Sequence, residues 1–141
     1  LVQGGVLQTW VLDSRSARQL GLQSNARAAR GPASPPGPSA SNLFFEPGHL
    51  SPSALMADIR EGLYITEMMG SSINGLTGDY SRGASGFMIR DGQIAEPVAG
   101  FTLAGNLLEI FASITLADDL VFRFGTDAPT LRTDVLNTAG A

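Results

Sequence analysis

The dipeptide Asp91-Gly92 separates two short strand-like runs, residues 87–89 and 93–98. Asp-Gly is preferred in two-residue type I′ turns, because both central residues of such a turn need positive φ angles. The pattern therefore predicts a β-hairpin. Pro97 cannot donate to a ladder, so we expect the end of the second strand to lie at a sheet edge. Any fold for this chain must then contain an antiparallel sheet.

Three segments begin with a residue that can cap a helix, namely Asp13, Ser51 and Asn106. Each of these side chains can accept a hydrogen bond from a free backbone N–H of the first helical turn. We expect Gly21 and Gly62 to end the first two helices, since glycine readily adopts the left-handed conformation. The third helix is expected over residues 107–117. The sequence thus predicts three short helices.

Strand-like segments occupy much of the remaining chain. Residues 2–12 resemble a hairpin around Gly4-Gly5, and further strands are expected at 43–46, 63–69, 120–124 and 130–140. Residues 22–42 are rich in Pro, Gly and Ser and predict an exposed loop or strap. About seven or eight strands with three helices indicate an α+β fold dominated by antiparallel hairpins. We expect residues 1–141 to form one domain of a longer protein, because the sequence starts at Leu1.

The residue types present limit the chemistry that this chain can carry out. It contains no cysteine and one histidine, His49, whereas zinc sites need three or four His, Cys or carboxylate ligands. His49 is expected at the surface. Asp118-Asp119 could bind a hard cation, but paired acids after a helix are more often solvated. No metal site is therefore expected within this chain.

Residues 77–86, TGDYSRGASG, contain serines flanked by glycines. Ser81 and Ser85 lack the spacing of a nucleophile elbow, and no histidine spacing suggests a base. Carboxylate chemistry stays open, since Glu67, Asp79 and Glu96 could converge. From composition alone, residues 77–86 form either a structural turn or the wall of a peptide-binding cleft. No catalytic residue is predicted.

The charge distribution bears on the partners of the chain. The formal net charge is −4, with nine Arg and no Lys, which argues against direct binding of nucleic acid. A local exception is a group of cations that indicates a solvated loop or, alternatively, a nucleic-acid arm: Arg15, Arg18, Arg27 and Arg30. No apolar run approaches the roughly 20 residues of a membrane helix. The lack of cysteine fits a cytoplasmic protein.

The segment TGDYSRGASGFMIRDGQIAEPV, followed by LAGNL, resembles the TldD/PmbA family, whose members are often called modulators of DNA gyrase. The family pattern is matched at Thr77, Gly78, Asp79, Ser81, Gly83, Ala84, Ser85, Gly86, Phe87, Gly92, Ile94, Pro97, Val98, Ala104, Gly105 and Asn106. Ala17, Gly21, Asn42, Gly48, Pro129, Leu131 and Gly140 extend the match over nearly the whole chain. The resemblance implies the C-terminal domain of a much longer bacterial protein.

The family has two branches that pair, and this chain resembles the PmbA branch, also called TldE. The TldD branch is a metalloprotease, with a zinc-binding helix and a Cys ligand in an insert before the final strands. Here only residues 121–127 occupy that place, and the chain has no Cys. The resemblance implies a non-catalytic, substrate-binding or regulatory subunit of a two-component zinc metallopeptidase. Zinc is expected in the catalytic partner and no cofactor in this chain.

The resemblance also implies an unfolded protein or peptide as the substrate, with roles in proteolysis and peptide maturation. We expect the peptide to lie as a strand in a chamber that this segment helps to line. The expected substrate-binding residues are Thr77, Gly78, Asp79, Ser81, Gly83, Ala84 and Gly86. The partner is a TldD-like subunit in a heterodimer, or a second copy in a homodimer. The alternatives are a gyrase-modulating module and a self-sufficient peptidase with ligands outside this chain.

Overall fold

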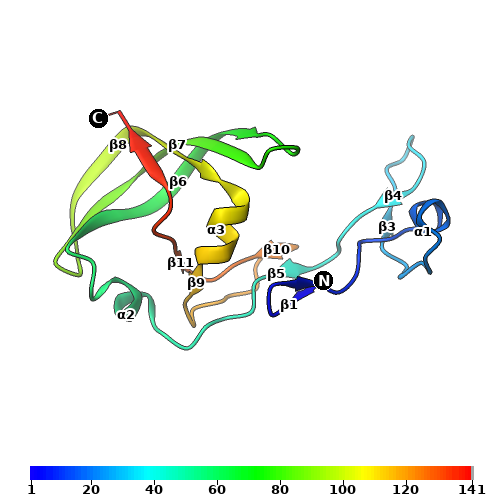
Figure 1. The fold of residues 1–141 in the computed structure, drawn as a ribbon, viewed down its shortest axis with the longest axis horizontal. Coiled ribbons are helices and arrows are strands. Elements are labelled where there is room, and N and C mark those ends of the chain that lie inside the picture. The colour runs from blue at the N-terminus through cyan, green and yellow to red at the C-terminus, as the bar shows by residue number, and fades with distance from the viewer. Residues whose placement is uncertain (141) are drawn as a thin grey trace. The chain divides into compact units, whose positions relative to one another are not determined.

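A computed structural model describes residues 1–140, without the side chain of Ser71 (Figure 1). The chain divides into two compact units. Unit 1 comprises Leu1–Phe44 with Phe122–Asp127, and unit 2 comprises Phe45–Val121 with the residues from Ala128 onward. No helix in residues 1–140 combines the length and the apolar character needed to span a membrane.

Unit 1 begins with the predicted hairpin and the predicted helix. Strands β1 (Val2–Gln3) and β2 (Val6–Leu7) pair antiparallel around Gly4 and Gly5, which have φ angles of 56° and 77°. Helix α1 (Ser14–Leu20) starts at Asp13, whose side chain accepts a hydrogen bond from the backbone N–H of Ser16 at 2.6 Å. The helix ends at Gly21 in the left-handed conformation, so both expected ends are confirmed.

The rest of unit 1 contains, among the described residues, two ladders of two residue pairs each. Within the exposed Pro/Gly/Ser-rich segment, β3 (Ala28–Ala29) pairs with β4 (Gly37–Pro38), and β5 (Leu43–Phe44) pairs in parallel with β10 (Thr126–Asp127). The prediction of a strand at residues 120–124 is wrong, because the structure has no strand there. The carboxylate of Asp127 accepts hydrogen bonds from the backbone N–H groups of Arg123 and Phe124, and this local turn removes them from any ladder.

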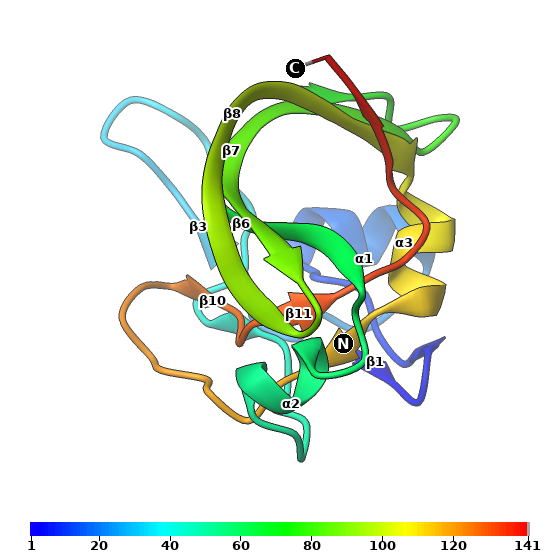
Figure 2. The same cartoon turned by 90° about the vertical axis from the view of Figure 1, so that its left-hand side faces the viewer.

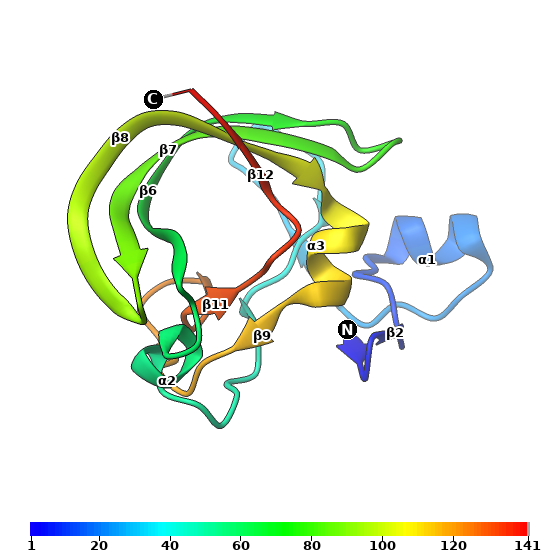
Figure 3. The same ribbon diagram turned by 60° about the vertical axis from the view of Figure 1, so that its left-hand side comes forward.

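Unit 2 is built on a four-stranded antiparallel sheet in the order β12-β8-β7-β6. Its strands are β6 (Glu61–Ile73), β7 (Asp79–Arg90), β8 (Gln93–Asn106) and β12 (Asn137–Ala139). The turn between β7 and β8 has positive φ angles at Asp91 (46°) and Gly92 (77°), which confirms the predicted hairpin. Figures 2 and 3 show that β6, β7 and β8 curl strongly, with α3 and the segment leading into β12 on the concave side.

Shorter elements complete unit 2. They are α2 (Pro52–Met56), α3 (Leu107–Ser113), and β9 (Thr115–Leu116) paired with β11 (Leu131–Arg132). Both predicted caps are confirmed, since Ser51 accepts from Ala54 N–H and Asn106 from Leu108 N–H. Helix α2 is shorter than expected, because the carbonyls of Ile59 and Arg60 accept from the turn at Gly92 and Asp91. Gly62 therefore lies in β6 and does not end the helix.

The core of unit 2 lies on the concave face of the sheet. Ala84, Phe101 and Leu103 are 0–3% exposed and form its centre. The partly buried residues packed against them are Leu63, Ile65, Val98 and Leu136. The chain is thus an α+β protein with a mostly antiparallel sheet, as predicted.

The segment 77–86 differs from the expectation that it precedes the hairpin as a loop. Strand β7 already begins at Asp79, and β7 is a central strand with β6 on one side and β8 on the other. The small residues of this segment allow both neighbouring backbones to come close. A Cβ atom at position 86 would lie 2.0 Å from the carbonyl oxygen of Tyr64. The loop itself is short and covers residues 74–78.

Candidate functional site

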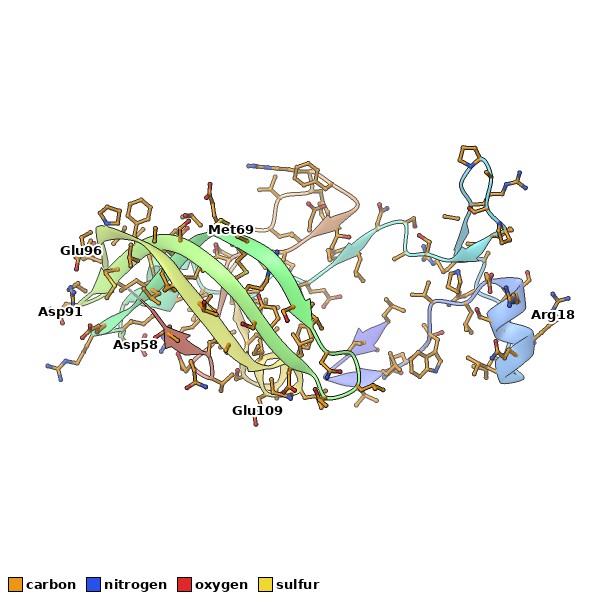
Figure 4. All side chains as sticks on the ribbon, turned by 90° about the horizontal axis from the view of Figure 1, so that it is seen from above. Arg18, Asp58, Met69, Asp91, Glu96 and Glu109 are labelled. Atoms are coloured by element: carbon orange, nitrogen blue, oxygen red, sulfur yellow. The ribbon has the colours of Figure 1, made fainter. Side chains whose placement is uncertain are left out.

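The convex face of the sheet carries exposed side chains. Side chains alternate between the two faces of a strand, so the residues between the core positions point outward. By the register of β6, β7 and β8, this convex face carries Glu67, Met69, Ser81, Gly83, Ser85, Phe87, Pro97, Ala99 and Thr102. Met69, labelled in Figure 4, is 56% exposed. No helix of unit 2 covers these strands from outside in Figures 2 and 3.

An open hollow of about 510 Å³ lies on this face. It is lined by Thr66, Glu67, Ser85, Gly86, Phe87, Pro97, Val98 and Ala99. Two irregularities in the ladder flank it, one at Thr66 in β6 and one at Gly100 in β8, where φ is 80°. Bulges of this kind bend a strand and redirect side chains, and they often occur next to functional sites.

Gly86, which lines the hollow, lies against the backbone of β6. With β6 so close, any larger residue would force the two strands apart, because the colliding atom is a backbone carbonyl. At position 83 the nearest atoms to an added Cβ are 3.8 Å away, which is ordinary contact distance. The close packing of β6 and β7 therefore requires glycine at position 86. At position 83 a side chain would fit, and its absence leaves that part of the convex face without a protruding group.

The polar groups of the hollow come from β6 and β7. The hydroxyl of Ser85 donates to Oε2 of Glu67 at 3.4 Å, and the hydroxyl of Thr66 donates to the carbonyl of Ser85 at 3.4 Å. Glu67 is exposed and takes part in no ion pair among the residues that the structure describes. The hollow thus presents one carboxylate beside apolar and small side chains.

Strand β6 lies at the edge of the sheet. Among the residues that the structure describes, only β7 pairs with it, so its other side has no strand partner, although the carbonyl of Gly70 accepts a hydrogen bond from Nε of Arg82 at 2.7 Å. Natural edge strands are commonly protected by Lys or Pro, and β6 contains neither. On the opposite side of the sheet, β12 covers β8 at residues 102–104 only, and the uncovered part of β8 contains Pro97. The edge of β6 is therefore the better template for another strand.

Three of the predicted site residues lie at one end of β7. Thr77 and Gly78 belong to the loop before it, and the hydroxyl of Thr77 donates to Oδ2 of Asp79 at 2.6 Å. The side-chain amide of Asn106 donates to the carbonyl of Thr77 at 2.8 Å, while its oxygen caps α3. This end of β7 is thus held in place by the start of α3.

The other predicted site residues divide between the two faces of the sheet. Ser81 and Gly83 lie on the convex face, whereas Ala84 and Gly86 are buried. The structure does not bring the seven residues together on one surface. Strand β7 itself has no free edge, because β6 and β8 pair with it on its two sides, whereas the other strand of the hairpin, β8, is covered by β12 only at residues 102–104.

The three carboxylates that could have converged have separate partners. Arg90 donates to Glu96 at 2.7 Å and lies 3.3 Å from Glu61. The hydrogen bond from Arg90 holds the pKa of Glu96 below its usual value. Asp79 binds the hydroxyl of Thr77, and Glu67 binds that of Ser85. These pairings give no shared acid–base centre.

Across residues 1–140, no three His, Asp or Glu side chains are close enough to hold a metal ion. His49 is exposed and lies three residues before the start of α2 at Pro52. The carboxylate of Asp119 accepts from the backbone N–H and the hydroxyl of Thr130, at 2.8 and 2.7 Å. The functions proposed below therefore use no metal held by this chain.

The hollow contains residues that were not predicted as site residues from the sequence, among them Phe87, Pro97 and Ala99. They come from two strands and meet only through the register of the hairpin. The period-two pairs Ser85-x-Phe87 and Pro97-x-Ala99 are a sequence signal that could have placed them on one face.

A family model described as PmbA/TldA metallopeptidase C-terminal domain matches residues 1–140. The Metalloprotease PmbA of Escherichia coli O157:H7 is 36% identical over 124 residues, which cover 87% of this chain and 26% of that protein. The Metalloprotease PmbA homolog of Haemophilus influenzae is 34% identical over 144 residues, which cover 99% of this chain and 30% of that protein. The chain thus spans between a quarter and a third of these relatives.

Solved structures show the same fold. A Thermotoga maritima protein, described as a modulator of a DNA gyrase, has a TM-score of 0.85 at 30% identity, over 98% of this chain and 32% of that one. TldE from Thermococcus kodakarensis has a TM-score of 0.88 over 99% of this chain and 33% of that one, with 22% identity, and supports the fold alone. The chain therefore belongs to the PmbA/TldD family of metallopeptidases and corresponds to its C-terminal domain.

Proposed function

We propose that this domain is the substrate-binding part of a PmbA-branch subunit and presents unfolded peptides to a zinc-bearing, TldD-like partner. The observation that carries the proposal is the free edge of β6. The partner forms a heterodimer with the full-length protein, and a homodimer is the alternative arrangement. The complex is cytoplasmic and acts on unfolded proteins and peptides.

A free strand edge suits an unfolded substrate for a physical reason. Backbone N–H and C=O groups are common to all peptides, so pairing with β6 provides affinity without reading the sequence. Only an extended segment can pair in this way, because a folded protein has already used its backbone groups. Strand β6 has 13 residues, and its longest run without an irregularity, residues 61–65, is long enough for a short peptide to pair.

The residues of this chain support a binding role more than a catalytic one. Its candidate nucleophiles, Ser81 and Ser85, lie inside a strand and have no histidine beside them in any described contact. Its relatives bear the name metalloprotease, and its own donors do not fit zinc. In this proposal the bond-breaking groups come from the partner.

Amide hydrogen exchange tests the proposal directly. The full-length protein is incubated with an unfolded peptide, and exchange is followed in residues 61–73. We expect slower exchange in this segment, with the segment 115–117 unchanged as an internal reference. A matched peptide that is N-methylated at alternate residues cannot pair and is expected to give no protection. Equal protection by both peptides, or none by either, would contradict pairing at β6.

A second candidate function follows from the Thermotoga maritima relative, which is described as a modulator of a DNA gyrase. A folded protein with its own free strand edge could pair with β6 in the same way. Binding of folded gyrase subunits to the full-length protein, competed by the unfolded peptide, would favour this candidate. Binding of the unfolded peptide alone favours the first.

A further inference from the structure

We propose that the polypeptide before Leu1 in the full-length protein continues strand β1 and pairs with residues 10–12 of this chain. The inference goes beyond the proposed function, because it concerns how this domain is joined to the rest of its protein. The matching family model describes a C-terminal domain, and the chain covers 26% and 30% of two PmbA relatives. Most of the full-length protein is therefore expected to precede Leu1.

The pairing between β1 and β2 changes at Leu1. Within the ladder, Val2 lies opposite Leu7. At the next position, the carbonyl oxygen of Leu1 accepts hydrogen bonds from two successive backbone N–H groups, those of Gln8 at 2.7 Å and Thr9 at 3.4 Å. Two residues opposite one is the arrangement of a β-bulge, which shifts the pairing of the residues beyond it by one position.

This shift turns the backbone of Val11 towards the side on which β1 lies. Alternate residues of an extended segment direct their N–H and C=O groups to the same side. Trp10 and Leu12 follow this rule, since the side chain of Asn25 donates to the carbonyl of Trp10 at 2.7 Å and accepts from the N–H of Leu12 at 3.0 Å. The backbone of Val11 therefore points away from Asn25.

The backbone of Val11 has no hydrogen-bond partner among the described residues, although Val11 is half-buried. Backbone N–H and C=O groups that are removed from water are almost always paired in folded proteins. A continued β1 supplies the partners. Beyond the bulge, Trp10 lies opposite the residue immediately before Leu1, and Val11 exchanges both of its hydrogen bonds with the residue before that one.

A groove with exposed apolar side chains lies along the same segment. It has a volume of about 350 Å³ and is lined by Leu7, Gln8, Thr9, Trp10, Leu12, Leu22 and Gln23. Trp10 is 57% exposed and Leu22 is 50% exposed. The polypeptide before Leu1 enters at this groove, because Leu1 is hydrogen-bonded to Gln8 and Thr9 of its lining. The proposed strand thus covers apolar surface as well as pairing the backbone of Val11.

Disulfide trapping in the full-length protein tests the register. The residue immediately before Leu1 is replaced by cysteine and combined with either Trp10→Cys or Val11→Cys, after any other cysteine has been replaced by serine. Opposite side chains on one face have Cβ atoms about 5 Å apart, which is close to disulfide geometry, whereas side chains on opposite faces point apart. On mild oxidation, we expect most molecules with Trp10→Cys and few with Val11→Cys to form the disulfide. Thiol alkylation followed by mass spectrometry measures both fractions.

Amide exchange in the unmodified full-length protein gives an independent measurement. The N–H of Val11 should exchange about 100-fold more slowly than in an unstructured peptide, because the proposed strand accepts its hydrogen bond. Gly5, at the exposed tip of the same hairpin, serves as the rapidly exchanging reference. Rapid exchange at Val11 would overturn the proposal, as would equal disulfide yields in the two variants or no disulfide with Trp10→Cys. Peptide binding at β6 is tested on residues 61–73, so either proposal can fail alone.

Discussion

The carbonyl oxygen of Tyr64 lies 2.0 Å from where a Cβ atom at position 86 would stand. The strands β6 and β7 are therefore in direct backbone contact at this point, next to the irregularity at Thr66. Gly86 is also among the residues that line the hollow. A single glycine thus permits the close packing of β6 and β7 beside the candidate site.

Gly86→Ala should destabilise the protein. The added methyl group meets a backbone carbonyl, which cannot move without separating β6 from β7. We expect a loss of about 1–3 kcal/mol, the range typical of overpacking. Urea unfolding, followed by circular dichroism, measures the difference.

Gly83→Ala is the matched control, because position 83 lies on the same strand with 3.8 Å of clearance. Its free energy of unfolding should stay within about 0.5 kcal/mol of the wild type. Equal destabilisation by the two substitutions would show that a general intolerance of β7, not the contact with Tyr64, is responsible.

Asn106 joins the cap of α3 to the loop that precedes β7, since its oxygen accepts from Leu108 and its amide donates to the carbonyl of Thr77. Asn106→Ala removes both bonds and should cost about 1–2 kcal/mol, with the cap as the larger part. Asn106→Asp keeps the cap and removes the amide donor. We expect it to be more stable than Asn106→Ala, as measured by thermal unfolding at neutral pH. The reverse order would mean that the bond to Thr77 matters more than the cap.

Asp58 should make the stability of unit 2 sensitive to acid. The hydrogen bond from Arg132 holds the pKa of Asp58 below the usual value of an aspartate. A lowered pKa in the folded state gives stability that is fully present above the unfolded-state pKa and is lost as the pH falls through the folded-state pKa. Asp58→Asn should therefore be less stable than the wild type near neutral pH, and the difference should shrink below about pH 4.

Urea unfolding between about pH 7 and pH 2.5 measures this difference for the wild type and Asp58→Asn. Glu46→Gln removes a charge from an exposed residue and serves as the control. A gap between Asp58→Asn and the wild type that stays constant over the whole range would contradict a role of the Asp58–Arg132 pair in acid sensitivity.

The local features of this fold could be predicted from the sequence. Helix caps at Asp13, Ser51 and Asn106 and the turn at Asp91-Gly92 each depend on a few neighbouring residues, and all are present. The full length of the long strands could not be predicted, because their irregularities interrupt the alternation of apolar and polar residues. A segment of small residues then resembles a loop.

The candidate site was less predictable, because its residues meet only through strand pairing. Glu67 lies opposite Ser85, and Phe87 lies opposite Pro97, so the hollow combines three strands. A one-residue change in register would turn each of these side chains to the other face. The sequence of any one strand therefore does not specify the site.

Gly83→Leu tests whether the convex face takes part in peptide handling. The clearance beside Met69 allows a larger side chain to point outward without disturbing the sheet. We expect assembly with the partner and thermal stability to be unchanged, while cleavage of an unfolded peptide slows several-fold. Unchanged cleavage would contradict a role for this part of β7.

Cleavage of an unfolded peptide tests the central proposal most directly. The full-length protein is assayed with zinc, first alone and then with a TldD-branch partner from the same cell. We predict cleavage only when the partner is present, and full loss of that cleavage on adding a chelator. Chelator-sensitive cleavage by the full-length protein alone would contradict the account, since this domain would then belong to a complete enzyme.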